Sequence, residues 1–301
     1  MNKGILYGIG AYLIWGFFPL YFKAIQMVPA LQIMFHRVVW SFFFLAILIL
    51  LKKDWPRLKA QVDNPRVVLV YTLAACLLAL NWLIYIWGVN SGQVVETSLG
   101  YFINPLVSVL LGVVILRERL RPLQWAPVAL AGIGVLYLTL QHGSLPWIAL
   151  ALAFTFGMYG LLKKIAPLGA LYGLTLETAI LFLPALGYLL FVESRGSGSF
   201  GHLSWNLNAV LALSGVVTAL PLLMFATAAR SIPLSLVGIL QYFAPSVQFL
   251  LGVFLYREPF SLPQRIGFGI IWTALLIYTL EGFLERRRNA HVVLAPAEPG
   301  D

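Results

Sequence analysis

The chain alternates long apolar stretches with short polar loops along almost its whole length. About 20 consecutive apolar residues are needed to cross the roughly 30 Å hydrocarbon layer of a bilayer as an α-helix. Ten stretches are close to that length, which predicts ten transmembrane helices. They cover residues 4–23, 31–51, 67–89, 94–116, 123–140, 146–163, 169–191, 208–228, 234–256 and 264–284.

The composition supports an all-α integral membrane protein. Only 10% of the residues are charged, against about 25% in soluble domains. The net charge of +9 does not indicate a nucleic-acid partner, because the basic residues are spread over short loops rather than gathered in one patch. The apolar stretch after Lys3 is interpreted as the first membrane helix and not as a cleaved signal peptide, since nine similar stretches follow it.

The distribution of Lys and Arg predicts the orientation in the membrane. With the N-terminus inside, fifteen of the twenty Lys and Arg residues fall on the inner side and four on the outer side, while Arg37 lies within a span. Loops on the cytoplasmic side carry an excess of Lys and Arg. Both termini are therefore expected in the cytoplasm, with residues 285–301 forming a disordered cytoplasmic tail.

One block of sequence occurs twice, 140 residues apart. The Leu-Leu-Gly-Val of residues 110–113 returns at 250–253, and the dipeptide Arg117-Glu118 returns as Arg257-Glu258. Such self-similarity is typical of internal duplication. We expect a first five-helix repeat over residues 1–141 and a second over residues 142–284.

The number of helices in each repeat has a geometric consequence. Because five is odd, the second repeat must enter the membrane from the opposite side, so the two copies are inverted. Inverted repeats are common in secondary transporters, where the substrate site lies near the bilayer midplane between the two halves. Both Arg-Glu dipeptides are interpreted as structural markers at helix ends.

Several short motifs together resemble the RarD group of the EamA family, in the drug/metabolite transporter superfamily. They are the run from Gly8 to Pro19, Phe35-His36-Arg37, Asn81-Trp82 with Tyr85, and the run from Glu96 to Pro105 that leads to Arg117-Glu118. The resemblance covers roughly residues 3–285. It implies two EamA units, a bacterial inner membrane, and a cavity lined mainly by helices 1–4 and 6–9. Founding members were named for a link to chloramphenicol sensitivity, so it also suggests small amphipathic solutes.

Charged residues within spans are costly and indicate function. Arg37 and Glu177 occupy equivalent positions of the two repeats with opposite charge, and each is expected to face a different water-filled vestibule. The functional interpretation is anion attraction by Arg37 and substrate or proton handling by Glu177. The structural one is that each anchors its own helix. His36 could also titrate near neutral pH, although a single histidine on an apolar helix is more often a hydrogen-bonded core residue.

The helix over residues 94–116 carries small and polar residues at four-residue steps along one side. Gly100, Ser108 and Gly112 are typical of close helix packing. Glu96 and Asn104 are candidates for the cavity, and Glu96 is also a candidate for proton coupling. The alternative for Glu96 is a solvated position at the membrane rim.

Other spans supply aromatic and amide side chains, which suit an ordinary small-molecule pocket. Aromatic residues also face lipid or the membrane interface, so this signal alone does not separate the two. The remaining cavity candidates are Trp15, Asn81, Tyr85, Tyr101, Tyr159, Gln241 and Gln248.

The sequence offers little for other chemistry. It contains no nucleotide-binding loop and no His-Glu-x-x-His motif, and its four histidines and single cysteine, Cys76, are too scattered for a metal site. We therefore predict a secondary transporter that is not an enzyme and needs no cofactor, working in the bilayer on a small molecule, with a homodimer left open. The alternatives are an integral-membrane enzyme acting on a lipid or isoprenoid, and an ion channel whose ring of charge forms on oligomerisation.

Overall fold

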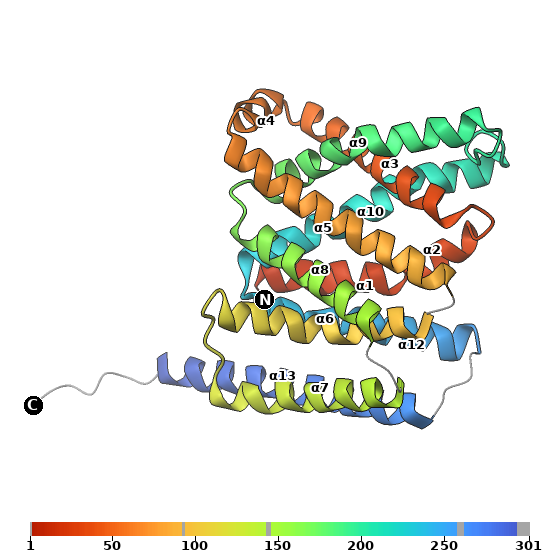
Figure 1. The fold of residues 1–301 in the computed structure, drawn as a ribbon. Helices are drawn as coiled ribbons and strands as arrows, with labels where there is room; N and C mark the ends of the chain where they lie inside the picture. Colours follow the sequence, from red (N-terminus) through yellow and green to blue (C-terminus); the bar gives the residue numbers. More distant parts are fainter. Residues whose placement is uncertain (1, 92–93, 143–145, 258–261, 294–301) are drawn as a thin grey trace, which may run out of the picture. The chain divides into compact units, whose positions relative to one another are not determined.

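The computed structural model describes residues 2–91, 94–142, 146–257 and 262–293, and within these residues it contains helices and no strand (Figure 1). The first half of the chain forms α1 (Lys3–Gly16), α2 (Phe18–Ala24), α3 (Ala30–Leu51), α4 (Trp55–Val62), α5 (Pro65–Asn90), α6 (Val94–Val114) and α7 (Pro122–His142). The second half forms α8 (Trp147–Ile165), α9 (Ala170–Ser194), α10 (Trp205–Ser231), α11 (Leu234–Gln241), α12 (Phe243–Leu250), η1 (Leu251–Leu255) and α13 (Leu262–Val293).

The all-α membrane architecture predicted from the sequence is confirmed. Eight helical segments among the described residues are long and apolar enough to cross a bilayer. The other two predicted spans correspond to α6, of which Leu99–Val114 is a shorter apolar helix, and to α13. The count of ten spans is therefore not reached by this measure. Helix α4, which the apolar pattern did not predict, connects α3 to α5.

Two of the predicted spans are interrupted rather than continuous. The first breaks at Phe17 between α1 and α2, two residues before Pro19. Proline has no N–H and cannot bond the carbonyl four residues earlier, which here belongs to Trp15. The side chain of Gln248 instead donates from Nε2 to that carbonyl oxygen at 3.1 Å. The second break falls at Tyr242, between α11 and α12.

The chain divides into two compact units that do not follow the predicted repeat boundary. Unit 1 comprises residues 1–118 and 146–258, and unit 2 comprises residues 119–145 and 259–301. Unit 2 holds α7 and α13, which pack against each other. An ion pair joins them, with Arg121 Nη2 2.7 Å from Glu281 Oε2. Each predicted repeat thus places its first four spans in unit 1 and its fifth in unit 2.

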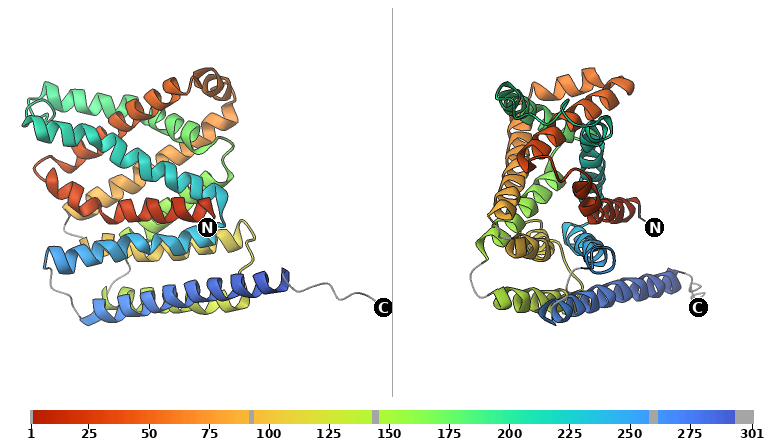
Figure 2. Two further views of the ribbon diagram at one scale, coloured as in Figure 1. Left: turned by 180° about the vertical axis from the view of Figure 1, so that it is seen from behind. Right: turned by 90° about the vertical axis from the view of Figure 1, so that its right-hand side faces the viewer.

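The helices of unit 1 pack closely through small residues. Helix α10 lies beside α1 (Figure 2) and also packs on α3. At the α3–α10 contact, a Cβ on Gly215 would lie 2.3 Å from the backbone carbonyl carbon of Trp40, so only glycine fits. Ser41 Oγ donates to the Gly215 carbonyl at 3.1 Å. Close backbone approach of this kind is the usual way in which membrane helices associate.

The C-terminal helix is longer than the sequence pattern predicts. Helix α13 continues to Val293, whereas the predicted span ends at residue 284 and a disordered tail was expected from residue 285. Residues 294–301 lie outside the described part of the chain.

A candidate substrate-binding cavity

A cavity of about 330 Å³ lies within unit 1, toward the end where α2 finishes and α3 begins. Its volume is at the small end of the roughly 300–1,000 Å³ that is usual for small-molecule sites. Helices from both predicted repeats line it. The lining residues are Tyr12, Trp15, Phe18, Pro19, Phe22, Arg37, Leu78, Asn81, Trp82, Tyr85, Thr97, Gly100, Tyr101, Asn104, Leu152, Phe156, Leu222, Gln241, Ala244, Pro245 and Gln248.

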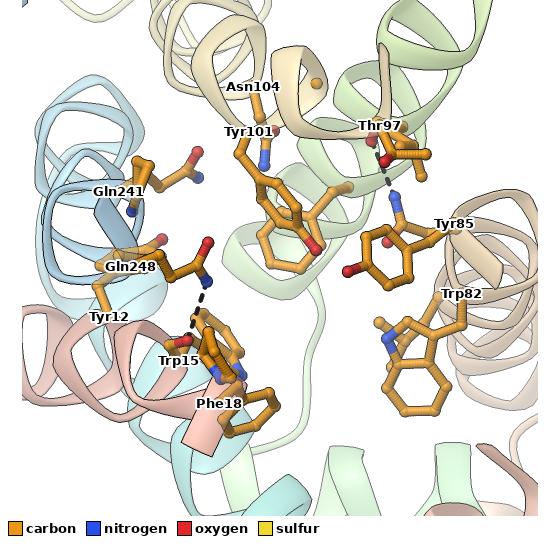
Figure 3. A pocket seen from close by; sticks show the side chains of 18 of the residues that line it. Tyr12, Trp15, Phe18, Trp82, Tyr85, Thr97, Tyr101, Asn104, Gln241 and Gln248 are labelled. Atoms are coloured by element: carbon orange, nitrogen blue, oxygen red, sulfur yellow. Dashed lines mark hydrogen bonds between the residues drawn. The ribbon is translucent and has the colours of Figure 1, made fainter. Parts of the chain in front are cut away.

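The structure brings most of the candidates from the sequence together at this cavity. Those that line it are Trp15, Arg37, Asn81, Tyr85, Tyr101, Asn104, Gln241 and Gln248. Figure 3 labels all of these except Arg37 and Asn81. Glu96 belongs to α6, but its side chain lies outside the described part of the structure. Whether any of these residues binds substrate stays a prediction.

Glu177 does not line the cavity. Its side chain is 1% exposed, and its Oε1 lies 2.7 Å from the Nζ of Lys163, which is itself 2% exposed. The hydroxyl of Tyr159 donates to the other carboxylate oxygen at 3.1 Å. The expectation that Glu177 faces a water-filled vestibule does not hold in this structure, because its side chain is buried. A buried carboxylate needs a compensating cation, and Lys163 supplies it.

Tyr159 and His36 also lie away from the cavity. Tyr159 is fully buried and stacks on Phe225 with 5.9 Å between ring centroids. His36 is buried, and its ring centroid lies 5.3 Å from that of Phe200. The core interpretation of His36 therefore fits its surroundings better than exposure to a vestibule does.

Arg37 places a positive charge in the cavity wall. Its Nε donates to Thr218 Oγ1 on α10 at 2.8 Å. The guanidinium carbon lies 4.5 Å from the ring centroid of Trp82, a cation–π distance, with the rings of Phe18 and Phe22 slightly farther away. Among the described residues no carboxylate lies within ion-pair distance of Arg37.

Aromatic rings make up facing walls of the cavity. Trp15 and Phe18 project from one side, and Trp82 and Tyr85 project from the other (Figure 3). Trp15 is 5.9 Å from Phe156, and Tyr85 is 6.0 Å from Tyr101, between ring centroids. Such walls offer apolar contact to a planar solute.

Three buried polar atoms on the lining residues have no hydrogen-bond partner in the structure. They are Tyr12 Oη, Asn104 Oδ1 and Gln241 Oε1. Buried polar groups are almost always hydrogen-bonded, so a cluster of unpaired ones at a cavity is typical of a site that receives a polar solute or water. Asn81 differs, since its Nδ2 is already bonded to the Leu152 carbonyl and to Thr155 Oγ1, both at 2.9 Å.

Comparison with known proteins identifies the family. Residues 2–140 match the EamA-like transporter family. The chain is 47% identical over 285 residues to the "Uncharacterized transporter YojE" of Bacillus subtilis (strain 168), covering 92% of this chain and 94% of that protein. The chain belongs to the EamA-like transporter family.

A second relative and a solved structure extend the comparison of this EamA-family chain. "Protein RarD" of Streptomyces exfoliatus is 44% identical, over 96% of this chain and 91% of that protein. A solved structure titled "Crystal structure of protein" matches with a TM-score of 0.67 at 20% identity, covering 92% of this chain and 97% of that one, which supports the fold. The EamA-family protein is thus a multi-pass membrane transporter, and its bacterial relatives support a location in a bacterial inner membrane.

The lining residues that sequence reasoning did not single out in the EamA-family chain include Tyr12, Thr97 and Phe156. Phe156 could have been found from the repeat, since it lies 141 residues after Trp15, the spacing that also relates Lys23 to Lys164. Tyr12 lies one helical turn before Trp15 and faces the same side of α1. Thr97 carried no signal beyond its position in α6.

The opposite end of unit 1 in this EamA protein is closed by side chains that bind helix termini. The carboxylate of Glu118 accepts hydrogen bonds from the N–H groups of Leu234 and Ser235, at 2.6 and 2.9 Å, and from Ser235 Oγ at 2.7 Å. A carboxylate at this place caps the start of α11 and complements its dipole. Lys164 Nζ donates at 2.7 Å to the carbonyl of Ile232, just after α10.

Proposed function

We propose that this protein is a secondary transporter that moves small amphipathic metabolites or drug-like solutes by alternating access, in the direction of export. The observation that carries the proposal is the asymmetry of unit 1. A solute-sized cavity lies toward one end, whereas polar contacts and buried aromatic rings fill the other. A transporter that exposes its site to one side at a time requires such an arrangement.

The orientation of the cavity follows from the predicted topology. With both termini in the cytoplasm, as the Lys and Arg distribution predicts, α2 ends and α3 begins on the outer side. The cavity would then face outward, and Glu118 would close the cytoplasmic end. Export by this cycle ends with release from such an outward-facing state. The resemblance to drug/metabolite transporters supports the direction.

The inverted repeat is part of the same proposal. We infer that residues 1–141 and 142–284 are two copies of a five-helix unit with opposite orientation. The family match over residues 2–140 ends close to the proposed boundary. Both copies supply walls of the cavity, which agrees with a site at the interface between two similar halves.

Proton coupling is the energy source that this proposal includes. Glu96 and Glu177 are the candidate carboxylates within the spans, together with His36. In the present conformation Lys163 neutralises Glu177. Glu177 could exchange a proton only after the Lys163 contact loosens during the transport cycle, which makes the pair a sensor of conformation as well as a candidate carrier.

Reconstitution into liposomes tests transport directly. The purified protein is expected to take up at least one metabolite or drug, identified first by thermal stabilisation, and to exchange it in counterflow without an ion gradient. A pH gradient should accelerate uptake by the wild type. Glu177→Gln should lose that acceleration while retaining counterflow. Conversion of a lipid without vectorial movement of solute would instead support the membrane-enzyme alternative.

A further inference from the structure

Two basic side chains in the helices of unit 1, Lys163 and Arg37, have different surroundings. Lys163 on α8 is buried and forms an ion pair with Glu177 at 2.7 Å. Arg37 on α3 lines the cavity, is half-buried, and has only a neutral hydroxyl and aromatic rings as partners among the described residues. Among the described residues, Lys163 thus has a carboxylate partner and Arg37 has none.

An uncompensated cation inside a membrane protein needs an explanation. Arginine keeps its charge in proteins, and removing that charge from water without a counterion is costly. The contacts that Arg37 does make hold it in place rather than neutralise it. Its Nε is used by Thr218 and one face of its guanidinium lies near Trp82 at 4.5 Å. The terminal N–H groups have no carboxylate partner in the part of the chain that the structure describes, and together they match the two oxygens of a carboxylate.

We infer that the cavity selects small organic anions: solutes with one carboxylate, which binds Arg37, and an aromatic or apolar body. This inference rests on the proposed transport function and adds the class of substrate. The ring walls of Trp15, Tyr85 and Tyr101 take the apolar body. The unpaired acceptor oxygens of Asn104 and Gln241 favour an N–H or O–H donor elsewhere on the solute.

A pair of isosteric probes isolates the charge. N-acetylphenylalanine carries a carboxylate, an aromatic ring and an amide N–H, and N-acetylphenylalanine amide differs only in having a neutral carboxamide. Phenylalanine amide serves as a cationic comparison. Dissociation constants are measured by calorimetry with the full-length protein in lipid nanodiscs. The wild type should bind the anion at least tenfold more tightly than the neutral amide, and the cation more weakly still.

Substitutions then assign that preference to one residue. Arg37→Gln should remove the preference for the anion while leaving the affinity for the neutral amide within about twofold, as expected when only the charge contact is lost. Arg37→Lys should retain part of the preference, because it keeps the charge without the planar fork. The matched control is Arg195→Gln, which neutralises an exposed arginine at the end of α9 and should change nothing.

Several outcomes would overturn the inference: equal affinity of the wild type for anion and amide, no binding of either probe, or an anion preference that survives in Arg37→Gln. If Arg37→Gln does not fold, the wild-type probe series and Arg37→Lys still decide. Proteoliposome uptake separates this inference from the transport proposal. Uptake without charge preference refutes the anion site alone, whereas anion-selective binding without uptake supports the anion site and refutes transport.

Discussion

Arg117 and Arg257 have the same left-handed backbone conformation, with φ = 54° at both, although they lie 140 residues apart. Each follows a copy of the repeated Leu-Leu-Gly-Val. In each copy the residue before the arginine donates its N–H to the carbonyl five residues earlier, at 3.3 Å in the first copy and 3.0 Å in the second. The duplicated sequence therefore corresponds to a duplicated turn, which supports the proposed repeat.

The first prediction tests whether this turn explains the repeated dipeptide. A residue other than glycine in the left-handed region costs about 1–2 kcal/mol, and β-branched residues cost more. Arg117→Gly should therefore leave the protein as stable as the wild type or more so, whereas Arg117→Val should be about 1–2 kcal/mol less stable than the glycine variant. Thermal unfolding in detergent measures the difference.

The same two substitutions at Arg119 give the reference. Arg119 is exposed and its φ is not positive, so glycine and valine should differ little there. Both variants at each position lose the same charge, and the comparison isolates backbone conformation. Greater stability of Arg117→Val than of Arg117→Gly would mean that the left-handed turn is not what this position requires.

The second prediction concerns Glu118, which caps the start of α11 with three hydrogen bonds. Hydrogen bonds to charged groups contribute about 1.5–3 kcal/mol, so Glu118→Ala should favour opening of this end of unit 1. In a Cys76→Ser background, Leu234→Cys reports on opening, because Leu234 is fully buried. Glu118→Ala should raise its rate of reaction with a water-soluble maleimide at least tenfold.

Glu193→Ala is the control for this measurement. Glu193 is an exposed carboxylate that pairs with His202 at 2.8 Å, far along the chain from α11. Its removal should leave the labelling of Leu234→Cys unchanged. Equal labelling with and without Glu118 would show that the cap does not hold this end closed.

The helices could be predicted from the sequence because each depends on a local property, a run of apolar residues. The polar cavity candidates could also be found, since charged and amide side chains within spans are rare, whereas the aromatic ones are too common for their presence to be decisive. The partner of Glu177 could not be found in this way. Lys163 stands at the end of its predicted span and resembles a loop residue, and its burial beside Glu177 depends on α5 and α10, which pack against both α8 and α9. Similarly, the capping of α11 by Glu118 joins residues more than a hundred positions apart.

The third prediction separates structural from coupling roles of Glu177. Removing one member of a buried ion pair typically costs about 3–5 kcal/mol, whereas replacing both members with apolar residues is often nearly neutral. Glu177→Gln should therefore lower the thermal midpoint strongly, and the double variant Lys163→Met with Glu177→Met should recover most of the loss. Removing Glu193 from its exposed pair with His202 should cost less than about 1 kcal/mol.

The double variant also sharpens the coupling experiment. If Glu177 carries protons, the restabilised double variant should still lack acceleration by a pH gradient while performing counterflow. Full gradient dependence in that variant would exclude Glu177 as the coupling group and direct attention to Glu96. Loss of both activities together with low stability in Glu177→Gln alone would reflect unfolding, which is why the comparison needs the double variant.

The fourth prediction uses the repeat to identify an outer gate. At the closed end, Tyr159 and Phe225 stack with 5.9 Å between centroids and 13° between planes. Their equivalents by the repeat spacing are Phe18 and Tyr85, which line opposite walls of the cavity (Figure 3). If the two halves exchange conformations during transport, Phe18 and Tyr85 should come together as the closed end opens. That contact would close the cavity by bringing its opposite aromatic walls together.

Cysteine cross-linking can detect this exchange. In a Cys76→Ser background, Phe18→Cys with Tyr85→Cys should form little disulfide alone and severalfold more when Glu118→Ala is added, because that change favours the opposite conformation. Phe18→Cys with Trp87→Cys is the matched control, since Trp87 lies nearby on α5 but packs against Trp147, and its yield should stay low. A yield for the Phe18 and Tyr85 pair that is independent of Glu118 would break the link between the two ends. Such independence would mean that this chain does not close one end of its cavity by opening the other.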